Sequence, residues 1–216
     1  MTSTPDLTTA PQRASWFQRM FASAMASSAK TQATNYEAHK RRLFSDLHGD
    51  VLEIGAGTAP NLIYYPKDVR WIGIDPNPAM LPYAHDEAQR LGLTVQLREG
   101  QAEQLGVPDE SVDAVVSTLV LCSVHDQNRV LQEIRRVLKP GGRFVFIEHV
   151  AAPQKTGLRL LQRFIKPLWR PLTEGCHPDR ETWTAIEQAG FSRLQIDHFR
   201  LSLPIVGPHI AGYAVK

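Results

Sequence analysis

The sequence predicts an α/β protein with a doubly wound, mainly parallel seven-stranded sheet and an N-terminal helical lid. Two observations predict it: from residue 50 onward short β-rich runs alternate with helical stretches, and the first β-rich run ends in Gly-x-Gly. Alternation of this kind is typical of βαβ units, which place parallel strands side by side in one sheet. The predicted strands are 51–54, 70–74, 94–98, 112–118, 143–149, 191–199 and 209–215. Helices are expected at 79–91, 128–138 and 179–189.

The N-terminal part predicts a disordered segment followed by helices. Residues 1–14 are mostly polar and include two prolines, so we expect them to be disordered. Apolar residues then recur at helical spacing over 16–30, within a helical region that we place at 15–48. They are Trp16, Phe17, Met20, Phe21, Ala24 and Met25. A chain of 216 residues with 43% hydrophobic content suits one core, so 15–216 is expected to form a single domain.

Composition excludes several classes of protein. The net charge of +2 gives no signal for nucleic-acid binding. The longest uncharged apolar run, 114–124, is about half of the ~20 residues that a transmembrane helix needs. No basic cluster leads into an apolar stretch near the N-terminus, so no secretory signal is expected. These features favour a cytoplasmic protein.

The two cysteines predict neither a disulfide framework nor a metal site. Cys122 and Cys176 lie far apart and lack CxxC spacing. Cys176 precedes His177, but no third and fourth ligand follow at suitable spacing, so no bound metal is expected. Cys122 is interpreted as a small buried hydrophobe.

The stretch DVLEIGAGTAPN, residues 50–61, carries the main ligand signal. A parallel strand that ends in Gly-x-Gly before a helix forms a tight turn, where the backbone can approach a ligand closely. A P-loop is excluded because no Gly-Lys-Ser/Thr follows Gly57. The dinucleotide fingerprint GxGxxG requires a third glycine where this chain has Pro60, which argues against NAD. The remaining ligand is S-adenosylmethionine (SAM), which carries an amino acid and no pyrophosphate.

Polar residues after three successive strands fit SAM. Glu53, two residues before Gly55, can orient the turn and meet a cationic ammonium group. Asp75 closes the second strand, where a carboxylate can accept hydrogen bonds from both ribose hydroxyls. Gly100 to Glu103 follow the third strand, where a backbone N–H and an amide side chain could bind the adenine edge. Together, in this order, these elements form a strong signal.

At this point the chain resembles the class I SAM-dependent methyltransferases, which have a Rossmann-like fold, over residues 36–216. The matching stretches are VLEIGAGTAPN, GIDPNPAML, EGQAEQL, VDAVVSTLVLCSVHD and EIRRVLKPGGRFVFIEHV. The resemblance implies a cofactor site whose members follow the first, second, third and fourth strands. They are Glu53, Gly55, Ala56, Gly57, Asp75, Pro76, Gln101, Ala102, Thr118 and Leu119. This chain departs from the family at Ala59, where many members have glycine, and at Gln101, where many have aspartate.

A finer resemblance extends into the substrate half. The pieces TLVLCSV, EHVA, GCHPDRETW and GPHIAGYAVK are similar to the methyltransferase-like group that includes the animal alkyl-thiol S-methyltransferases. The resemblance implies methyl transfer from SAM to a small thiol or sulfide. The animal members carry an N-terminal membrane-anchoring segment, from which residues 16–30 depart because they contain Arg19, several serines and no long apolar span.

Thiol methylation makes modest demands on acid–base chemistry. A thiol has a pKa near ~8.5, so a small thiolate fraction exists at neutral pH and a strong general base is not obligatory. His149 ends the fifth strand and His125 follows the fourth, at the strand ends where ligands bind in open α/β sheets. We interpret both as candidate catalytic residues that position the acceptor or take its proton. The structural alternative is a strand-end hydrogen-bonding role for His149 and a solvated loop position for His125.

The stretch 157–172 combines apolar residues at helical spacing with four cations and no anion. A basic amphipathic helix of this kind can lie on an anionic membrane surface. The favoured interpretation is a substrate lid within an insertion at 155–178, and the two roles are compatible. Residues 16–30 invite the same two interpretations. The sequence leaves the oligomeric state open.

Other functions stay open at this stage. The methyl acceptor could be a phospholipid amine (N-methylation) or a quinone-type carbon (C-methylation). A protein that binds SAM without turnover and acts through partners is a second alternative.

Overall fold

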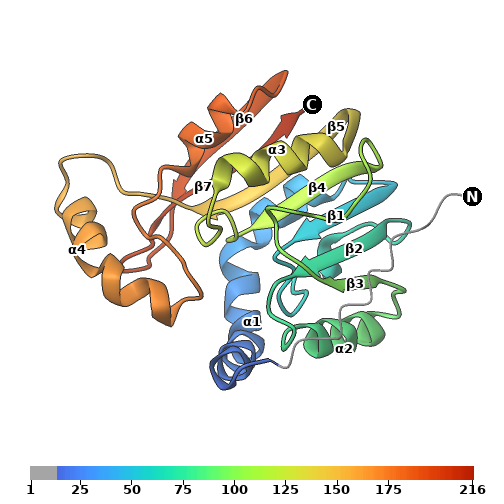
Figure 1. Ribbon diagram of the computed structural model, residues 1–216, viewed down its shortest axis with the longest axis horizontal. Coiled ribbons are helices and arrows are strands. Elements are labelled where there is room, and N and C mark those ends of the chain that lie inside the picture. Colours follow the sequence, from blue (N-terminus) through green and yellow to red (C-terminus); the bar gives the residue numbers. More distant parts are fainter. Residues whose placement is uncertain (1–13) are drawn as a thin grey trace, which may run out of the picture.

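Seven strands form one sheet in the computed structural model, which describes residues 14–216 apart from the side chains of 29–33 (Figure 1). The sheet order is β3-β2-β1-β4-β5-β7-β6. The strands are β1 (Asp50–Ile54), β2 (Arg70–Asp75), β3 (Gln96–Glu99), β4 (Val112–Thr118), β5 (Leu138–His149), β6 (Arg193–Arg200) and β7 (Pro208–Val215). Strands β1 to β5 pair in parallel, and β7 pairs antiparallel with both β5 and β6. The predicted α/β class and mainly parallel seven-stranded sheet are confirmed.

Helices cover both faces of this sheet, as a doubly wound fold requires. They are α1 (Trp16–Phe44), α2 (Leu81–Leu91), α3 (Gln127–Val137), α4 (Gly157–Leu172) and α5 (Thr182–Gln188), with a short 3₁₀ turn, η1 (Leu62–Tyr64). Successive β4 residues point to opposite faces: Val115 packs in the cluster with α3 and α5, while Val116 packs with Phe44 of α1. Helix α2 packs its Ala84 and Ala88 in a third cluster with Trp71.

The first helix runs further than its predicted end near residue 30. Helix α1 continues to Phe44 as one element, because Tyr36, Lys40, Leu43 and Phe44 place buried side chains at helical spacing. Ser15 caps its start, accepting from the Gln18 backbone while the Gln18 side chain accepts from the Ser15 backbone. The predicted disordered segment, residues 1–14, lies outside the described residues except for its last position.

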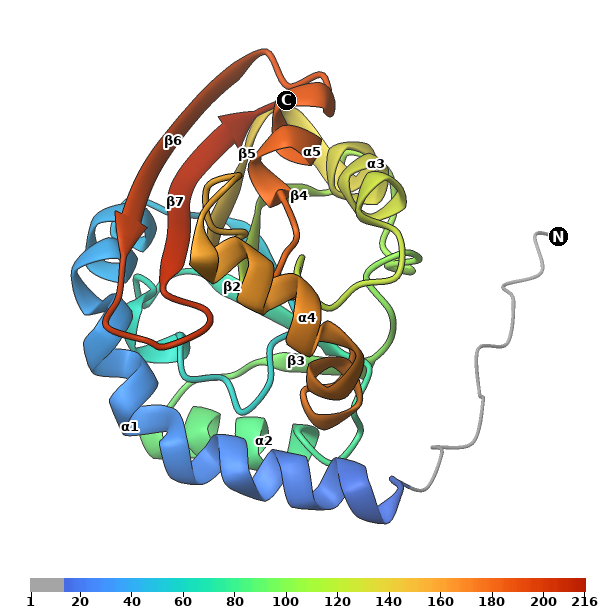
Figure 2. The same ribbon diagram turned by 90° about the vertical axis from the view of Figure 1, so that its left-hand side faces the viewer.

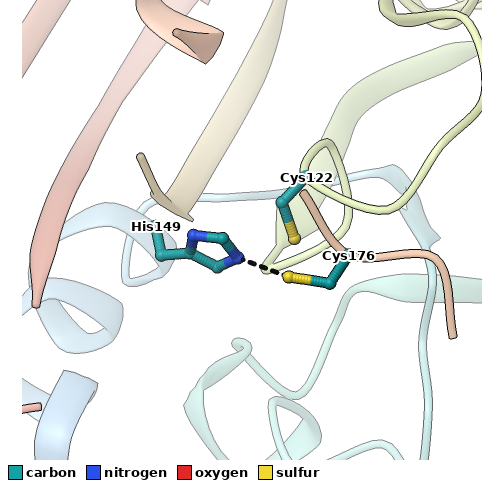
Figure 3. A group of neighbouring side chains, drawn as sticks. All are labelled: Cys122, His149 and Cys176. Atoms are coloured by element: carbon teal, nitrogen blue, oxygen red, sulfur yellow. Dashed lines mark hydrogen bonds between the residues drawn. The ribbon is translucent and has the colours of Figure 1, made fainter. Parts of the chain in front are cut away.

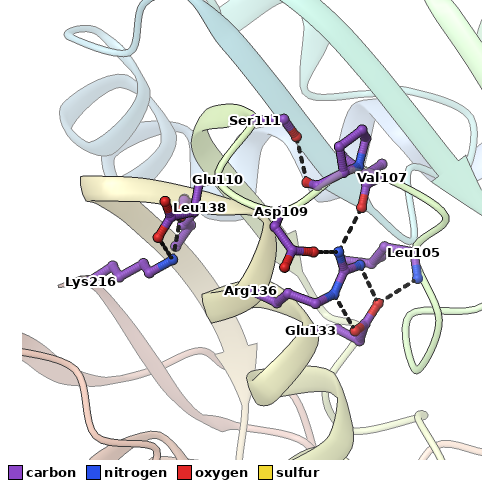
Figure 4. A network of polar contacts seen from close by, with 10 residues as sticks. Leu105, Val107, Asp109, Glu110, Ser111, Glu133, Arg136, Leu138 and Lys216 are labelled. Atoms are coloured by element: carbon purple, nitrogen blue, oxygen red, sulfur yellow. Dashed lines mark hydrogen bonds and ion pairs between the residues drawn. The ribbon is translucent and has the colours of Figure 1, made fainter.

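A polar network attaches the connection between β3 and β4 to α3 (Figure 4). The Arg136 guanidinium donates to both carboxylate oxygens of Glu133, at 2.7 and 2.8 Å, and to Asp109 at 2.6 Å. Glu133 in turn accepts from the Leu105 backbone N–H at 3.0 Å. Planar, charge-assisted bonds of this type fix geometry. The network therefore holds in place the segment that begins with Gln101 and Ala102.

No helix among residues 14–216 is both long enough and apolar enough to span a membrane. The carboxyl ends of the parallel strands lie along one edge of the sheet, which α1 and α4 flank (Figure 2). Ligands bind at this edge in open α/β sheets.

Candidate active site

Two adjoining cavities lie at the carboxyl ends of β1, β2 and β4. The first measures about 450 Å³ and the second about 160 Å³. The first is lined by the glycine turn, by Thr118 to Val120 and by the inner face of α1. The second is lined by residues 100–103 and 123–125. Gly55, Pro76, Val120, Ser123 and Glu174 line both cavities. One elongated ligand can therefore occupy the two cavities, whose volumes are in the range of small-molecule sites.

The turn after β1 adopts the tight conformation that its glycines allow. Gly55 has φ +58° and Gly57 has φ +56°, values that disfavour other residues. A Cβ on Gly55 would also lie 2.4 Å from the Val120 side chain. The Gly57 N–H donates to the carboxylate of Asp75 at 2.8 Å, which ties the turn to the end of β2.

Asp75 is buried at the wall of the first cavity. One carboxylate oxygen accepts from Gly57 and the other from the Asn77 backbone N–H, each at 2.8 Å. Burial raises the pKa of Asp75, and the two backbone N–H groups oppose that rise. Since each carboxylate oxygen can accept a second bond, Asp75 is suited to hold a ribose diol.

Glu53 is fixed by three protein donors. Its carboxylate accepts from Asn61 Nδ2 at 2.7 Å, Tyr65 Oη at 2.7 Å and Trp71 Nε1 at 2.9 Å. Burial raises its pKa, and these bonds together with the nearby Lys40 cation oppose the rise. Glu53 also lines the first cavity, so it can meet an ammonium group while it orients the turn.

Sequence reasoning missed Lys40, a cation of α1 that is only 1% exposed. Its ammonium lies 5.4 Å from the centre of the Tyr64 ring, and Lys40 is one of the residues that line the first cavity. Burial lowers the pKa of Lys40 to about 8, and the charge of Glu53 opposes that shift. A buried cation beside a cavity is suited to hold an anionic group of a ligand. The sequence held one sign that Lys40 is buried: it lies four residues after Tyr36 and four before Phe44, on the same side of α1.

Sequence reasoning also missed the pair formed by Tyr36 and His209. His209 Nδ1 lies 2.8 Å from the Gly207 carbonyl, which assigns the proton to Nδ1 and leaves Nε2 as the acceptor for Tyr36 Oη at 2.8 Å. Burial lowers the pKa of His209 to about 4, so the ring is neutral at physiological pH. Tyr36 lines the first cavity. The two partners are 173 positions apart in the sequence, which explains why no spacing pattern reveals them.

The remaining predicted cofactor residues divide between the two cavities. Gln101 and Ala102 line the second, and Ala56 and Leu119 line the first. Thr118 lines the first as well, where its Oγ1 accepts from Asn61 at 3.1 Å.

The structure does not bring the two predicted catalytic imidazoles together. His125 is exposed at the second cavity, and its backbone N–H donates to Glu103 at 2.8 Å. His149 is buried and lines neither of the two ligand cavities; its Nε2 lies 3.0 Å from Cys176 Sγ. Their catalytic roles stay predictions.

Three distant segments meet above Asp75. The Asn77 amide donates to the Glu174 carboxylate at 2.8 Å and to the Gln18 carbonyl at 3.2 Å. Burial, followed by the charge of Asp75, raises the pKa of Glu174 to about 7. This contact joins the start of α1 and the loop after α4 over the cavity.

We expect Glu174→Gln to change the pH dependence of stability. Between pH 4.5 and about 7 the folded protein keeps the Glu174 proton that the unfolded chain has lost, so this group makes stability fall as pH rises through that window. The variant has no titrating group at this position, so its free energy of unfolding should rise relative to that of wild type as pH increases from 4.5 to 7. Urea titrations at several pH values measure this difference. Glu187→Gln, which changes an exposed carboxylate of α5, is the control and should follow wild type. Parallel curves for wild type and Glu174→Gln would contradict the assignment.

Helix α4 contributes no residue to either cavity, although Glu174, within the predicted insertion at 155–178, lines both. Instead, α4 carries large apolar side chains that are exposed to solvent; the helix itself is labelled in Figure 2. Its exposed large side chains are Leu160, Leu161, Phe164, Leu168 and Leu172, and Phe164 is 84% exposed.

Comparisons with known proteins identify methyltransferases as relatives of this chain. The methyltransferase domain family matches residues 52–146. The human thiol S-methyltransferase TMT1A is 43% identical over 190 residues, covering 82% of this chain and 78% of that protein. The rat thiol S-methyltransferase TMT1B is 42% identical over 200 residues, covering 83% and 79%. A SAM-dependent methyltransferase structure from Thermotoga maritima superposes with a TM-score of 0.68 at 20% identity over 93% of this chain and 97% of that one, a likeness of fold.

Proposed function

Because the chain belongs to the family of the thiol S-methyltransferases TMT1A and TMT1B, we propose that it transfers the methyl group of SAM to the sulfur of a small apolar thiol or sulfide. SAM is the methyl donor of this enzyme. For a thiol, the thiolate sulfur attacks the methyl carbon as the carbon–sulfonium bond breaks. The products are a methyl thioether and S-adenosylhomocysteine, and the thiol proton passes to solvent or to a nearby base.

The two cavities support a specific placement of SAM. Asp75 would hold the ribose hydroxyls, and the turn at Gly55 and Gly57 would receive the methionine part. The buried ammonium of Lys40 would pair with the methionine carboxylate, at the end of the cavity where Glu53 also lies. Adenine would enter the second cavity beside Gln101. The sulfonium then lies near Thr118.

The apolar lining of the first cavity is the observation that best supports a small apolar thiol as the methyl acceptor. Phe17, Phe21 and Met25 come from α1, and Leu119 and Val120 directly follow β4. A mainly apolar surface suits a small alkyl or aryl thiol and can align its sulfur with the methyl carbon. Placement can supply much of the acceleration because part of the thiol is already ionised near neutral pH.

Incubation with SAM and a panel of acceptors tests the proposal. We expect mass spectrometry to detect methyl thioethers from apolar thiols, with no product from phospholipid amines or quinols. The Asp75→Ala variant serves as the inactive control. Methylated lipid amines or quinols with no product from any thiol would replace the proposed acceptor. SAM binding without any product across the panel would favour a non-catalytic SAM-binding protein.

We further propose that the apolar face of α4 contacts an anionic membrane surface. Arg163 and Arg170 lie exposed beside this face, so its charge is complementary to anionic lipid headgroups. Burying a large apolar side chain is worth roughly 1.5–3 kcal/mol, so Phe164→Ser with Leu168→Ser should weaken vesicle binding by at least about tenfold. Co-sedimentation with phosphatidylserine-containing vesicles measures this, and Tyr83→Ser on α2 is the control. Equal sedimentation of wild type and the double variant would refute the contact.

A further inference from the structure

Two thiols and one imidazole meet outside the two ligand cavities. Cys122 follows β4, His149 ends β5 and Cys176 lies in the loop after α4 (Figure 3). All three residues are buried, and their ligand atoms lie within 4.8 Å of one another. His149 Nε2 lies 3.0 Å from Cys176 Sγ. The proposed placement of SAM uses none of these three side chains.

We propose that Cys122, His149 and Cys176 form a binding site for one thiophilic divalent metal ion, of which Zn²⁺ is the best match. Zn²⁺ prefers thiolate sulfur and imidazole nitrogen, with bonds of about 2.3 and 2.0–2.1 Å. Binding would therefore draw ligand atoms that lie within 4.8 Å of one another to within about 4 Å. Three protein ligands leave a fourth tetrahedral position for a water or a thiol. Both cysteines would bind as thiolates, and binding releases the protons still present on sulfur.

The surrounding contacts hold these ligands in position without the metal. The Trp169 indole N–H donates to Cys176 Sγ at 3.3 Å, the kind of outer contact that orients metal ligands. The His177 backbone N–H donates to the Cys122 carbonyl at 2.9 Å and ties the two cysteine segments together. The Arg180 guanidinium donates to the carbonyls of Leu121 and Val124, on either side of Cys122.

The His149 ring contacts the cluster through one nitrogen only. His149 is 5% exposed, and its Nδ1 has no hydrogen-bond partner among the described residues. Its other nitrogen faces a sulfur. A metal at Nε2 would replace this single weak nitrogen–sulfur contact with a coordinate bond, and Nδ1 would carry the proton of the neutral ring.

The proposed metal site lies next to residues that line both ligand cavities. Ser123, next to Cys122, lines both cavities, and so does Glu174, two residues before Cys176. An ion shared by the two cysteines would tie these two walls together. It would also stabilise the folded chain, because it binds the native arrangement of ligands.

Metal titration of the full reduced chain tests the site independently of methyl transfer. We expect one equivalent of Zn²⁺ to bind in competition with a chromophoric chelator, to raise the melting temperature and to protect both thiols from alkylation. One equivalent of Co²⁺ should give a thiolate-to-metal charge-transfer band. Cys122→Ser, Cys176→Ser and His149→Gln should each weaken Zn²⁺ binding by at least about 100-fold, more than loss of an outer contact costs. His177→Gln, next to the cluster, should bind as wild type.

Absence of the cobalt band, or thiols that react equally fast with and without Zn²⁺, would overturn the proposal. Unchanged Zn²⁺ affinity in all three ligand variants would overturn it as well. The wild-type alkylation measurement decides the matter even if a variant fails to fold.

Discussion

Asp75→Ala is expected to weaken SAM binding by about a hundredfold or more. The carboxylate would accept one charge-assisted hydrogen bond from each ribose hydroxyl, and such bonds contribute about 1.5–3 kcal/mol each. The variant also releases the Gly57 and Asn77 backbone N–H groups, so the glycine turn loses its link to β2. Calorimetric titration with SAM and with S-adenosylhomocysteine measures the change.

Two controls separate ligand binding from folding. Asp86→Ala removes an exposed carboxylate on α2 and should leave SAM affinity unchanged. A thermal melt of the Asp75 variant without ligand reports whether the turn still forms. Wild-type affinity in a folded Asp75→Ala protein would exclude the proposed ribose site.

Gly212→Ala is expected to destabilise the fold by about 3 kcal/mol or more, at the upper end of overpacking effects. Gly212 lies in the interior of β7, between Phe146 of β5 and Ile196 of β6. A Cβ built there would lie 1.9 Å from the backbone carbonyl oxygen of Gln195. Because that oxygen belongs to the neighbouring strand, β6 and β7 must separate to relieve the clash.

Urea denaturation measures this loss. Gly157→Ala is the matched control, because its Cβ would meet nothing within 4 Å at the start of α4. We expect that control to stay within about 1 kcal/mol of wild type. Equal denaturation midpoints for the two variants would show that the sheet absorbs the clash.

The strand pattern was readable from sequence because each strand has a local signal. All seven predicted strands are present with small changes at their ends, and β5 begins at Leu138 rather than 143. That early start depends on pairing of Leu138 with Val112, beside an irregularity in the register. The extension of α1 to Phe44 likewise depends on packing against the sheet. Pairing and packing between distant segments leave weak traces in a local pattern.

In the candidate site, too, residues with a local sequence signal were predicted, and residues that depend on contacts between distant segments were missed. Glu53 and Gly55 lie at the end of β1, and Asp75 lies at the end of β2. Because the ends of parallel strands meet at one edge of a sheet, their positions along the chain predict that they lie close together. Lys40 precedes these strands in the sequence and lies on a helix. A lysine on a helix is usually exposed to solvent, so the sequence gives no reason to place it in the site. The cluster of Cys122, His149 and Cys176 requires one strand end and two loops to come together, and the spacing of residues along the chain does not reveal this.

The first cavity has walls of two different origins. Its floor is made of strand ends and the glycine turn, whose backbone is constrained by the whole sheet, whereas its roof is the side chains that α1 lays across the sheet edge. Substitutions among Phe17, Phe21 and Met25 therefore alter the shape offered to an acceptor without disturbing the strands. In such an architecture, relatives can diverge in what they methylate while keeping one common way of holding the donor.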